Sequence, residues 1–241
     1  MRLLSLILCF LLSGCVSSWV APSDFTYTVV RSGAYNLATY QRISDTTSPI
    51  HIYIEGDGAA FDAGGRPTNN PTPHGTFMRD LAVHDTAPNV VYLARPCQYV
   101  TSDSCSQTDW TDGRFSQTII ESMAHAIEQI VHKQPVILIG YSGGAMVSGL
   151  IIEQYPSIPV QKWVTIAGVL NHVDWTGYFG DMPLSKSMNL NKLPQISQVH
   201  YIASDDKVVP NELSRKWIAP ENLKTIDGAT HSSFPMAALE F

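Results

Sequence analysis

The sequence has few charged residues and no run of basic ones. Of its 241 residues 15% are charged, and the formal net charge is −6. Basic and aromatic side chains are not interleaved in the way that nucleic-acid-binding surfaces require. These absences exclude nucleic acid as an expected partner. With 44% hydrophobic residues, the chain can build one sizeable core and fits a single domain.

Long hydrophobic runs are also scarce. The apolar stretch from Leu3 to Leu12 follows Arg2 and is too short to span a bilayer as a mature helix. It ends in Leu12-Ser13-Gly14-Cys15, which resembles a bacterial lipobox, where the cysteine is lipidated and becomes the first residue. We therefore expect a lipoprotein signal peptide over residues 1–14 and a mature domain over residues 15–241. An ordinary cleaved signal peptide with an incidental cysteine is the alternative.

The lipobox resemblance also implies a location. The expected protein is exported and held at a membrane through a lipid on Cys15, facing the periplasm or the cell surface. Because the next residue is Val16 rather than aspartate, the resemblance favours the outer membrane.

Cysteine is sparse, with four residues in the whole chain. Cys9 lies in the predicted signal peptide and Cys15 would carry the lipid, which leaves Cys97 and Cys105. An exported protein folds in an oxidising compartment, so we predict a disulfide between these two. No second cysteine or histidine cluster lies nearby in sequence, so we predict no metal site.

Short apolar runs alternate with segments of helical periodicity. This alternation predicts an α/β fold with a mostly parallel sheet covered by helices on both faces. A hairpin is expected first, over 26–30 and 36–41 with its turn near Ser32-Gly33. The further expected strands are 50–54, 90–93, 136–139, 163–167, 199–203 and 223–226, and the expected helices are 76–84, 115–132 and 145–155.

The most informative segment is Gly140-Tyr141-Ser142-Gly143-Gly144. It lies between a predicted buried strand and a predicted helix, which is the context in which a serine becomes a nucleophile. Such a turn is tight, holds the serine in a strained conformation, and needs small residues at its flanks. The helix that follows directs its N-terminal amides at the reaction centre. The alternative is a glycine-rich turn such as those that bind phosphate.

A nucleophilic serine needs a base and an acid that orients the base. In strand–turn–helix sites of this kind the chain order is serine, acid, histidine. The strand that ends at Ala203 runs into two acids, and we favour Asp206 over Asp205 as the acid. A solvated turn is the alternative interpretation of this pair.

Eight histidines compete for the role of base. His231 follows the last predicted strand in a loop near the C-terminus, and we predict that it is the general base. His172 is a lesser candidate. The others lie in predicted helices, inside strands or well before the serine: His51, His74, His84, His125, His132 and His200.

An oxyanion hole needs two backbone amides directed at the developing negative charge. Gly143, directly after the serine, is expected to supply one. The loop after the third strand opens Glu55-Gly56-Asp57-Gly58, and Asp57, then Gly58, are the candidates for the other. A plain glycine-rich strand exit is the alternative.

With these residues placed, the chain resembles the alpha/beta-hydrolase superfamily, from the Glu55 loop through Ser142 and Asp206 to His231. It also resembles a subgroup of small bacterial lipoprotein hydrolases, and it departs from many relatives in having Glu55 where they have histidine. The segments that carry the second resemblance are 94–99, 171–176, Pro183-Leu184 and 187–189. The resemblance implies an alpha/beta-hydrolase fold with a short cap-like insertion over about 170–198.

The resemblance implies a serine hydrolase that cleaves an ester-like acyl bond through an acyl-enzyme, on a small-molecule or lipid-like ester, with no cofactor and no metal. Acyl transfer by the same residues, a peptidase and a non-catalytic envelope lipoprotein are the alternatives. Trp175, Tyr178 and Phe179 in the cap are expected either to line an acyl pocket or to pack in the core. Arg95 is expected to form a salt bridge, or else to face the cleft.

Overall fold

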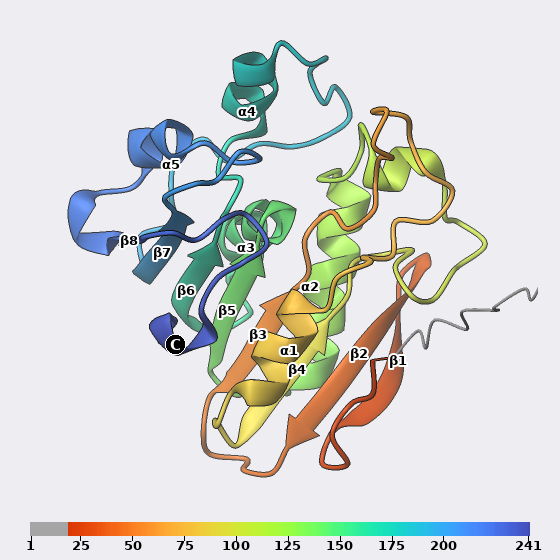
Figure 1. The fold of residues 1–241 in the computed structure, drawn as a ribbon. Coiled ribbons are helices and arrows are strands. Elements are labelled where there is room, and N and C mark those ends of the chain that lie inside the picture. The colour runs from red at the N-terminus through yellow and green to blue at the C-terminus, as the bar shows by residue number, and fades with distance from the viewer. Residues whose placement is uncertain (1–18) are drawn as a thin grey trace, which may run out of the picture.

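The computed structural model describes residues 19–241, so the predicted signal peptide and Cys15 lie outside the described residues. Its centre is an eight-stranded sheet in the order β1-β2-β4-β3-β5-β6-β7-β8 (Figure 1). β2 pairs antiparallel with β1 and β4, and all other neighbours are parallel. The strands are β1 (Thr26–Ser32), β2 (Tyr35–Ile43), β3 (Ile50–Ile54), β4 (Asn89–Leu93), β5 (Val136–Tyr141), β6 (Val160–Ile166), β7 (Ser197–Ala203) and β8 (Leu223–Ile226).

Helices cover both faces of the sheet because successive residues of a strand point to opposite faces. In β3, Ile50, Ile52 and Ile54 pack with α2 (Gln117–Val131) and α3 (Gly143–Gln154), whereas Tyr53 packs with α1 (Phe77–His84) and the C-terminal segment. The α-helices are α1 (Phe77–His84), α2 (Gln117–Val131), α3 (Gly143–Gln154), α4 (His172–Phe179) and α5 (Asn211–Trp217). Short 3₁₀ turns are η1 (Gln107–Trp110), η2 (Pro220–Asn222) and η3 (Met236–Ala238).

The predicted α/β architecture is confirmed, and two of its strands, β3 and β8, have the predicted bounds. The N-terminal hairpin is also present, with Gly33 at positive φ in its turn. Two helices were not predicted: α4 in the cap-like segment and α5 after Pro210. α1 is as short as α4 but buries Met78, Leu81 and Ala82, whereas α4 buries only His172 and Thr176 and α5 only Ser214. Neither missed helix therefore has a buried apolar stripe that the sequence could show.

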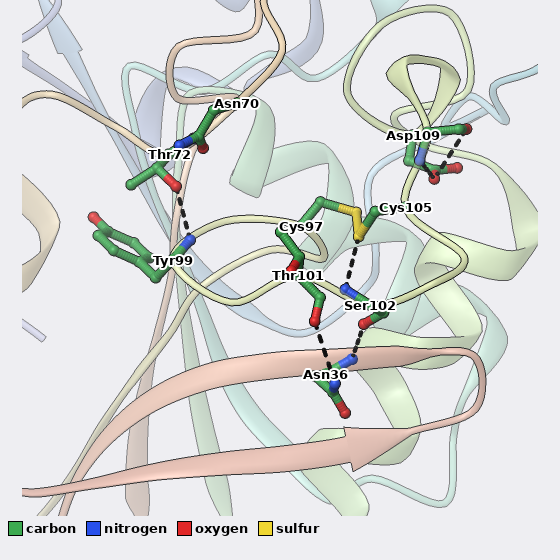
Figure 2. The surroundings of a disulfide bond; sticks show 10 residues. Asn36, Asn70, Thr72, Cys97, Tyr99, Thr101, Ser102, Cys105 and Asp109 are labelled. Atoms are coloured by element: carbon green, nitrogen blue, oxygen red, sulfur yellow. Dashed lines mark hydrogen bonds between the residues drawn. A yellow bond between two sulfur atoms is a disulfide. The ribbon is translucent and has the colours of Figure 1, made fainter.

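Cys97 and Cys105 form the predicted disulfide, with their Cα atoms 5.8 Å apart. The closed loop is tied to two other parts of the chain (Figure 2). The Asn36 N–H of β2 donates to Ser102 Oγ at 2.6 Å, and the Tyr99 N–H donates to Thr72 Oγ1 at 2.8 Å. The disulfide loop therefore joins the start of β2 to the loop between β3 and α1.

None of the helices within residues 19–241 is both long enough and apolar enough to cross a bilayer.

Candidate active site

Ser142 lies on a sharp turn between β5 and α3. Its φ of 51° and ψ of −121° place it in a strained region for a residue with a side chain. Three main-chain hydrogen bonds hold it: its N–H donates to Ile166 O, and its carbonyl accepts from the Ala145 and Val169 N–H groups, all at 3.0–3.1 Å. The turn places Ser142 at the N-terminus of α3, where the helix amides create a positive potential.

The glycines that flank Ser142 are required by close packing. A Cβ atom at Gly140 would lie 2.6 Å from the carbonyl carbon of Gly144, and one at Gly144 would lie 2.5 Å from the carbonyl oxygen of Ile54. Both contacts are with backbone, which cannot move away without disturbing β3 or α3. The collision expected from the sequence is therefore present.

Ser142, His231 and Asp206 form a hydrogen-bonded chain. His231 Nε2 lies 3.1 Å from Ser142 Oγ, and His231 Nδ1 lies 2.9 Å from Asp206 Oδ2. The other carboxylate oxygen of Asp206 accepts the Val208 and Val209 N–H groups, both at 2.8 Å, so the acid is fixed by its own turn. The structure thus brings together three residues that lie 64 and 25 positions apart in the sequence.

Tyr141 packs against His231 and is hydrogen-bonded to its backbone. Its ring centroid lies 5.2 Å from that of His231, and its hydroxyl donates to the His231 carbonyl oxygen at 3.1 Å. Burial raises the pKa of Tyr141, so the hydroxyl remains a donor at neutral pH. Tyr141 therefore orients the loop that presents the imidazole.

The competing candidates lie elsewhere. Asp205 is exposed, and His231 is bonded to Asp206 instead. His172 is buried at the start of α4 and stacks on Phe115 with ring centroids 6.0 Å apart. His200 is buried within β7.

The loop after β3 lies directly against the turn that carries Ser142. A Cβ atom built on Gly143 would overlap the Asp57 carboxylate, so this side chain touches the start of α3. The N–H groups of Asp57, Gly58 and Gly143 donate to no acceptor within residues 19–241. Three free amides thus lie in loops that border Ser142.

Two buried arginines hold the Asp57 side chain. Arg95 Nη1 donates to Asp57 Oδ1 at 2.5 Å and Arg114 Nη1 donates to Asp57 Oδ2 at 2.7 Å. Burial alone would raise the pKa of Asp57, but the Arg114 and Arg95 guanidiniums hold that pKa below its usual range. Arg95 also donates to the Arg114 carbonyl oxygen. The salt bridge expected for Arg95 is confirmed.

Glu55 points into the protein. One carboxylate oxygen accepts the Gly56 N–H at 2.9 Å and the other accepts the Tyr92 hydroxyl at 2.8 Å. Burial raises the pKa of Glu55, and these two donors offset part of that rise. Glu55 therefore braces the loop after β3 from behind.

A cavity of about 480 Å³ opens over Ser142 and His231. This volume lies within the range of small-molecule sites. The wall contains Phe77, Met78, Val169 and Val208 beside polar groups of Asp57, His74 and Ser232. The cavity adjoins Trp175 of the cap as well, whereas Tyr178 and Phe179 are half exposed and line none of the described cavities that border Ser142.

Comparison with solved structures decides the fold. Est1E from Butyrivibrio proteoclasticus superposes with a TM-score of 0.60 at 10% identity, over 88% of this chain and 93% of that one. A serine hydrolase without a lid from Xanthomonas campestris gives 0.54 at 12% identity, over 89% and 88%. An alpha-beta serine hydrolase homologue from Coxiella burnetii gives 0.54 at 15% identity, over 89% and 92%. This chain has the alpha/beta-hydrolase fold. No protein-family model and no curated protein matches its sequence.

Within the alpha/beta-hydrolase fold, sequence reasoning missed several residues of the site. Arg114 gave no signal, because it lies 57 positions from Asp57 in an irregular segment. Gln98 is buried, accepts the Arg95 N–H at 3.0 Å and donates to the Gly56 carbonyl at 2.9 Å. Gln98 lies in segment 94–99, which resembles small bacterial lipoprotein hydrolases, and this resemblance was the sequence signal that could have indicated it. Within residues 19–241 no three histidine, cysteine or acidic side chains are grouped so that they could hold a metal ion.

Proposed function

We propose that the protein is a serine hydrolase that cleaves an ester-like acyl bond through an acyl-enzyme intermediate. The observation that supports this most is the hydrogen-bonded chain from Ser142 Oγ through His231 to the buried Asp206, of which Ser142 and His231 line a cavity. Its order and contacts are those that activate a serine for attack on a carbonyl.

In the proposed mechanism Ser142 Oγ attacks the acyl carbon as its proton passes to His231 Nε2. Asp206 accepts the Nδ1–H of His231, which fixes the tautomer and stabilises the imidazolium. The tetrahedral intermediate expels the alcohol, which takes the proton from His231. Water then attacks the acyl-enzyme with His231 as base and releases the acid and free Ser142.

The developing oxyanion would be bound by the Gly143 amide and by an amide of the loop after β3. Asp57 N–H and Gly58 N–H are both free within the described residues, and the Asp57 side chain packs on Gly143. The two arginines neutralise the Asp57 carboxylate, which would otherwise oppose negative charge beside it. An oxyanion donor typically contributes about 3 kcal/mol of transition-state stabilisation.

A panel of p-nitrophenyl esters tests this function. Ser142→Ala should lower kcat by a factor of about 10⁴ to 10⁶, and Asp206→Asn by about 10⁴. Ser232→Ala is the matched control, because Ser232 lines the same cavity but its side chain makes no hydrogen bond to Ser142, His231 or Asp206 within the described residues. Equal rates for wild type and Ser142→Ala would refute the proposal.

We also propose that the enzyme works outside the cytoplasm on a lipid anchor at Cys15. The apolar stretch before Cys15 and the Cys97–Cys105 disulfide support export. Membrane fractionation of wild type and Cys15→Ser tests the anchor: the wild type should be in the membrane fraction and the variant should not.

A further inference from the structure

A second cavity adjoins the one over Ser142. It has a volume of about 740 Å³ and shares three wall residues with the first: Phe61, Arg114 and Trp175. The loop that contains Phe61 and Pro67 forms one side, and the segment after α4 forms the other. The two cavities therefore meet at a single wall beside the candidate active site.

Beyond that wall the second cavity has an apolar part formed by Pro67, Met182, Pro183 and Leu184. Besides Arg114, the polar residues of its lining are Thr111, Asp112, Thr176, Asp181 and Ser185. Met182 is 86% exposed although it is a large apolar side chain, and Phe61 is 41% exposed. Apolar side chains that remain in water around a concavity are typical of a surface that covers an apolar ligand.

The polar groups of the second cavity are largely occupied by the protein itself. The Asp112 carboxylate accepts from Ser185 Oγ at 3.0 Å and from the Lys186 N–H at 3.3 Å. The Arg114 guanidinium donates to Asp57 and to the Thr111 carbonyl. The Thr111 and Thr176 hydroxyls donate to backbone carbonyls. Of the charged side chains in this lining, the Asp181 carboxylate has no hydrogen bond or ion pair within residues 19–241, and it is exposed to water at the rim. The interior of the lining therefore favours a hydrocarbon.

The shared wall is fixed relative to the candidate catalytic residues. The Arg114 guanidinium lies 5.3 Å from the Phe61 ring centroid and 5.9 Å from that of Trp175. Trp175 Nε1 donates to the Val208 carbonyl at 2.7 Å, two positions after Asp206. A ligand group in the second cavity would thus be held at a defined position relative to Ser142.

We propose that the second cavity is a subsite for the remote apolar end of the substrate, so that the preferred substrate is an ester with an elongated hydrocarbon chain. This proposal rests on the proposed serine hydrolase function. The first cavity holds the groups next to the scissile bond, and the chain passes the wall of Phe61, Arg114 and Trp175. Each methylene that leaves water in the subsite should raise kcat/KM by about two- to fourfold, until the cavity is filled.

The test is a series of p-nitrophenyl esters from acetate to decanoate, used below their micelle concentrations. For the wild type, kcat/KM should rise with chain length. In Met182→Glu, which places a charge on the rim of the second cavity, the ratio of decanoate to acetate kcat/KM should fall by about tenfold or more. Met236→Glu is the matched control, because Met236 is 39% exposed and lines a different cavity. Its ratio should equal that of the wild type.

A second measurement separates the subsite from the chemistry. Calorimetry of decanoate binding to Ser142→Ala, with and without Met182→Glu, needs no turnover. The double variant should bind decanoate about tenfold more weakly.

If esters are cleaved but the chain-length ratio is the same in wild type and Met182→Glu, the subsite is wrong and the hydrolase function stands. If no ester is cleaved but decanoate binds with the expected difference, the hydrolase function fails and the apolar subsite stands. Equal decanoate binding, or none, overturns the subsite in either case.

Discussion

At the scale of single residues, the site is built around a carboxylate held between two buried cations. Asp57 joins Arg95 and Arg114, and its side chain rests on Gly143 at the start of α3. The three charged groups come from three separate loops. Their interaction therefore links the loop after β3 to the turn that carries Ser142.

Replacing Asp57 by asparagine should destabilise the protein, because two buried guanidiniums lose their counter-charge. We expect the free energy of unfolding to fall by about 3 kcal/mol, measured by urea denaturation. Glu240→Gln is the control, since Glu240 pairs with Lys224 on an exposed surface and its loss should be within error. An Asp57→Asn variant as stable as Glu240→Gln would contradict this account of the cluster.

Residue roles could be predicted where a local motif carried them. Ser142, Asp206 and His231 were placed from strand ends and chain order, and the structure brings all three within hydrogen-bond distance. Arg114 could not be placed, because its position depends on how an irregular segment folds against Asp57. The position of Glu55 was visible, but its inward direction follows from the buried Tyr92 hydroxyl.

At the scale of elements, the loop closed by Cys97 and Cys105 supports the site from outside. It is hydrogen-bonded to Asn36 of β2 and to Thr72 (Figure 2). The next residues after Thr72, Pro73 and His74, line the cavity over Ser142. Cys97 and Tyr99 have positive φ values of 71° and 62°, a conformation that the surrounding bonds must maintain.

Removing this disulfide, in the Cys97→Ser/Cys105→Ser double variant, should lower the free energy of unfolding by about 2–3 kcal/mol, because a short loop regains its freedom in the unfolded chain. Urea denaturation of the oxidised wild type and the variant measures this. Reduction of the wild type should give the same loss, and reduction of the variant should change nothing. A variant whose unfolding midpoint equals that of the oxidised wild type would show that the bridge contributes nothing to stability.

The regular elements could be predicted because β-strands of the buried sheet are short apolar runs. The cap could not: α4 has eight residues with Gly177 inside it, and its apolar side chains are split between the cavity and solvent. The local signals for α4 were at its two ends. The Asn171 side chain accepts the Asp174 N–H at 2.8 Å as an N-cap, and Gly180 ends the helix at a φ of 72°.

At the scale of the whole molecule, the parallel sheet gathers the site at one edge. The loop after β3 supplies Asp57, and those after β5, β7 and β8 supply Ser142, Asp206 and His231. Carboxyl ends of parallel strands meet at the same edge, where ligands bind in open α/β sheets. The fold class and the position of the site at the carboxyl ends of the strands could therefore be predicted from the order of the strands. The shape of the cavity could not be predicted in this way.

The stability of the whole fold should fall in mild acid because of His200. Burial lowers the pKa of His200 from 6.5 to about 4, and the neutral ring lies between Thr165 Oγ1 and Gln198 Oε1, both at 2.8 Å. The unfolded chain takes up this proton first, so the free energy of unfolding falls as pH drops from about 6.5 to about 4. The loss from this group reaches about 2 kcal/mol at pH of about 5 and is complete below its folded pKa.

His200→Gln tests this, because the variant cannot titrate at that position. At neutral pH the free energy of unfolding of His200→Gln should be lower than that of the wild type. Between neutral pH and about pH 5 it should then fall by about 2 kcal/mol less than that of the wild type. Burial also lowers the pKa of His172. Protonation of His172 therefore lowers the free energy of unfolding equally in the wild type and in His200→Gln. Parallel stability curves for wild type and variant would contradict the role of His200.

The central claim is that Ser142 is an activated nucleophile, and covalent labelling tests it most directly. The folded wild type should react with a fluorophosphonate, and peptide mass spectrometry should find the phosphonyl group on Ser142. Ser142→Ala should remain unlabelled, and His231→Ala should be labelled far more slowly because the base is missing. No adduct on the folded wild type, an adduct on another residue, or equal labelling of Ser142→Ala would contradict the account.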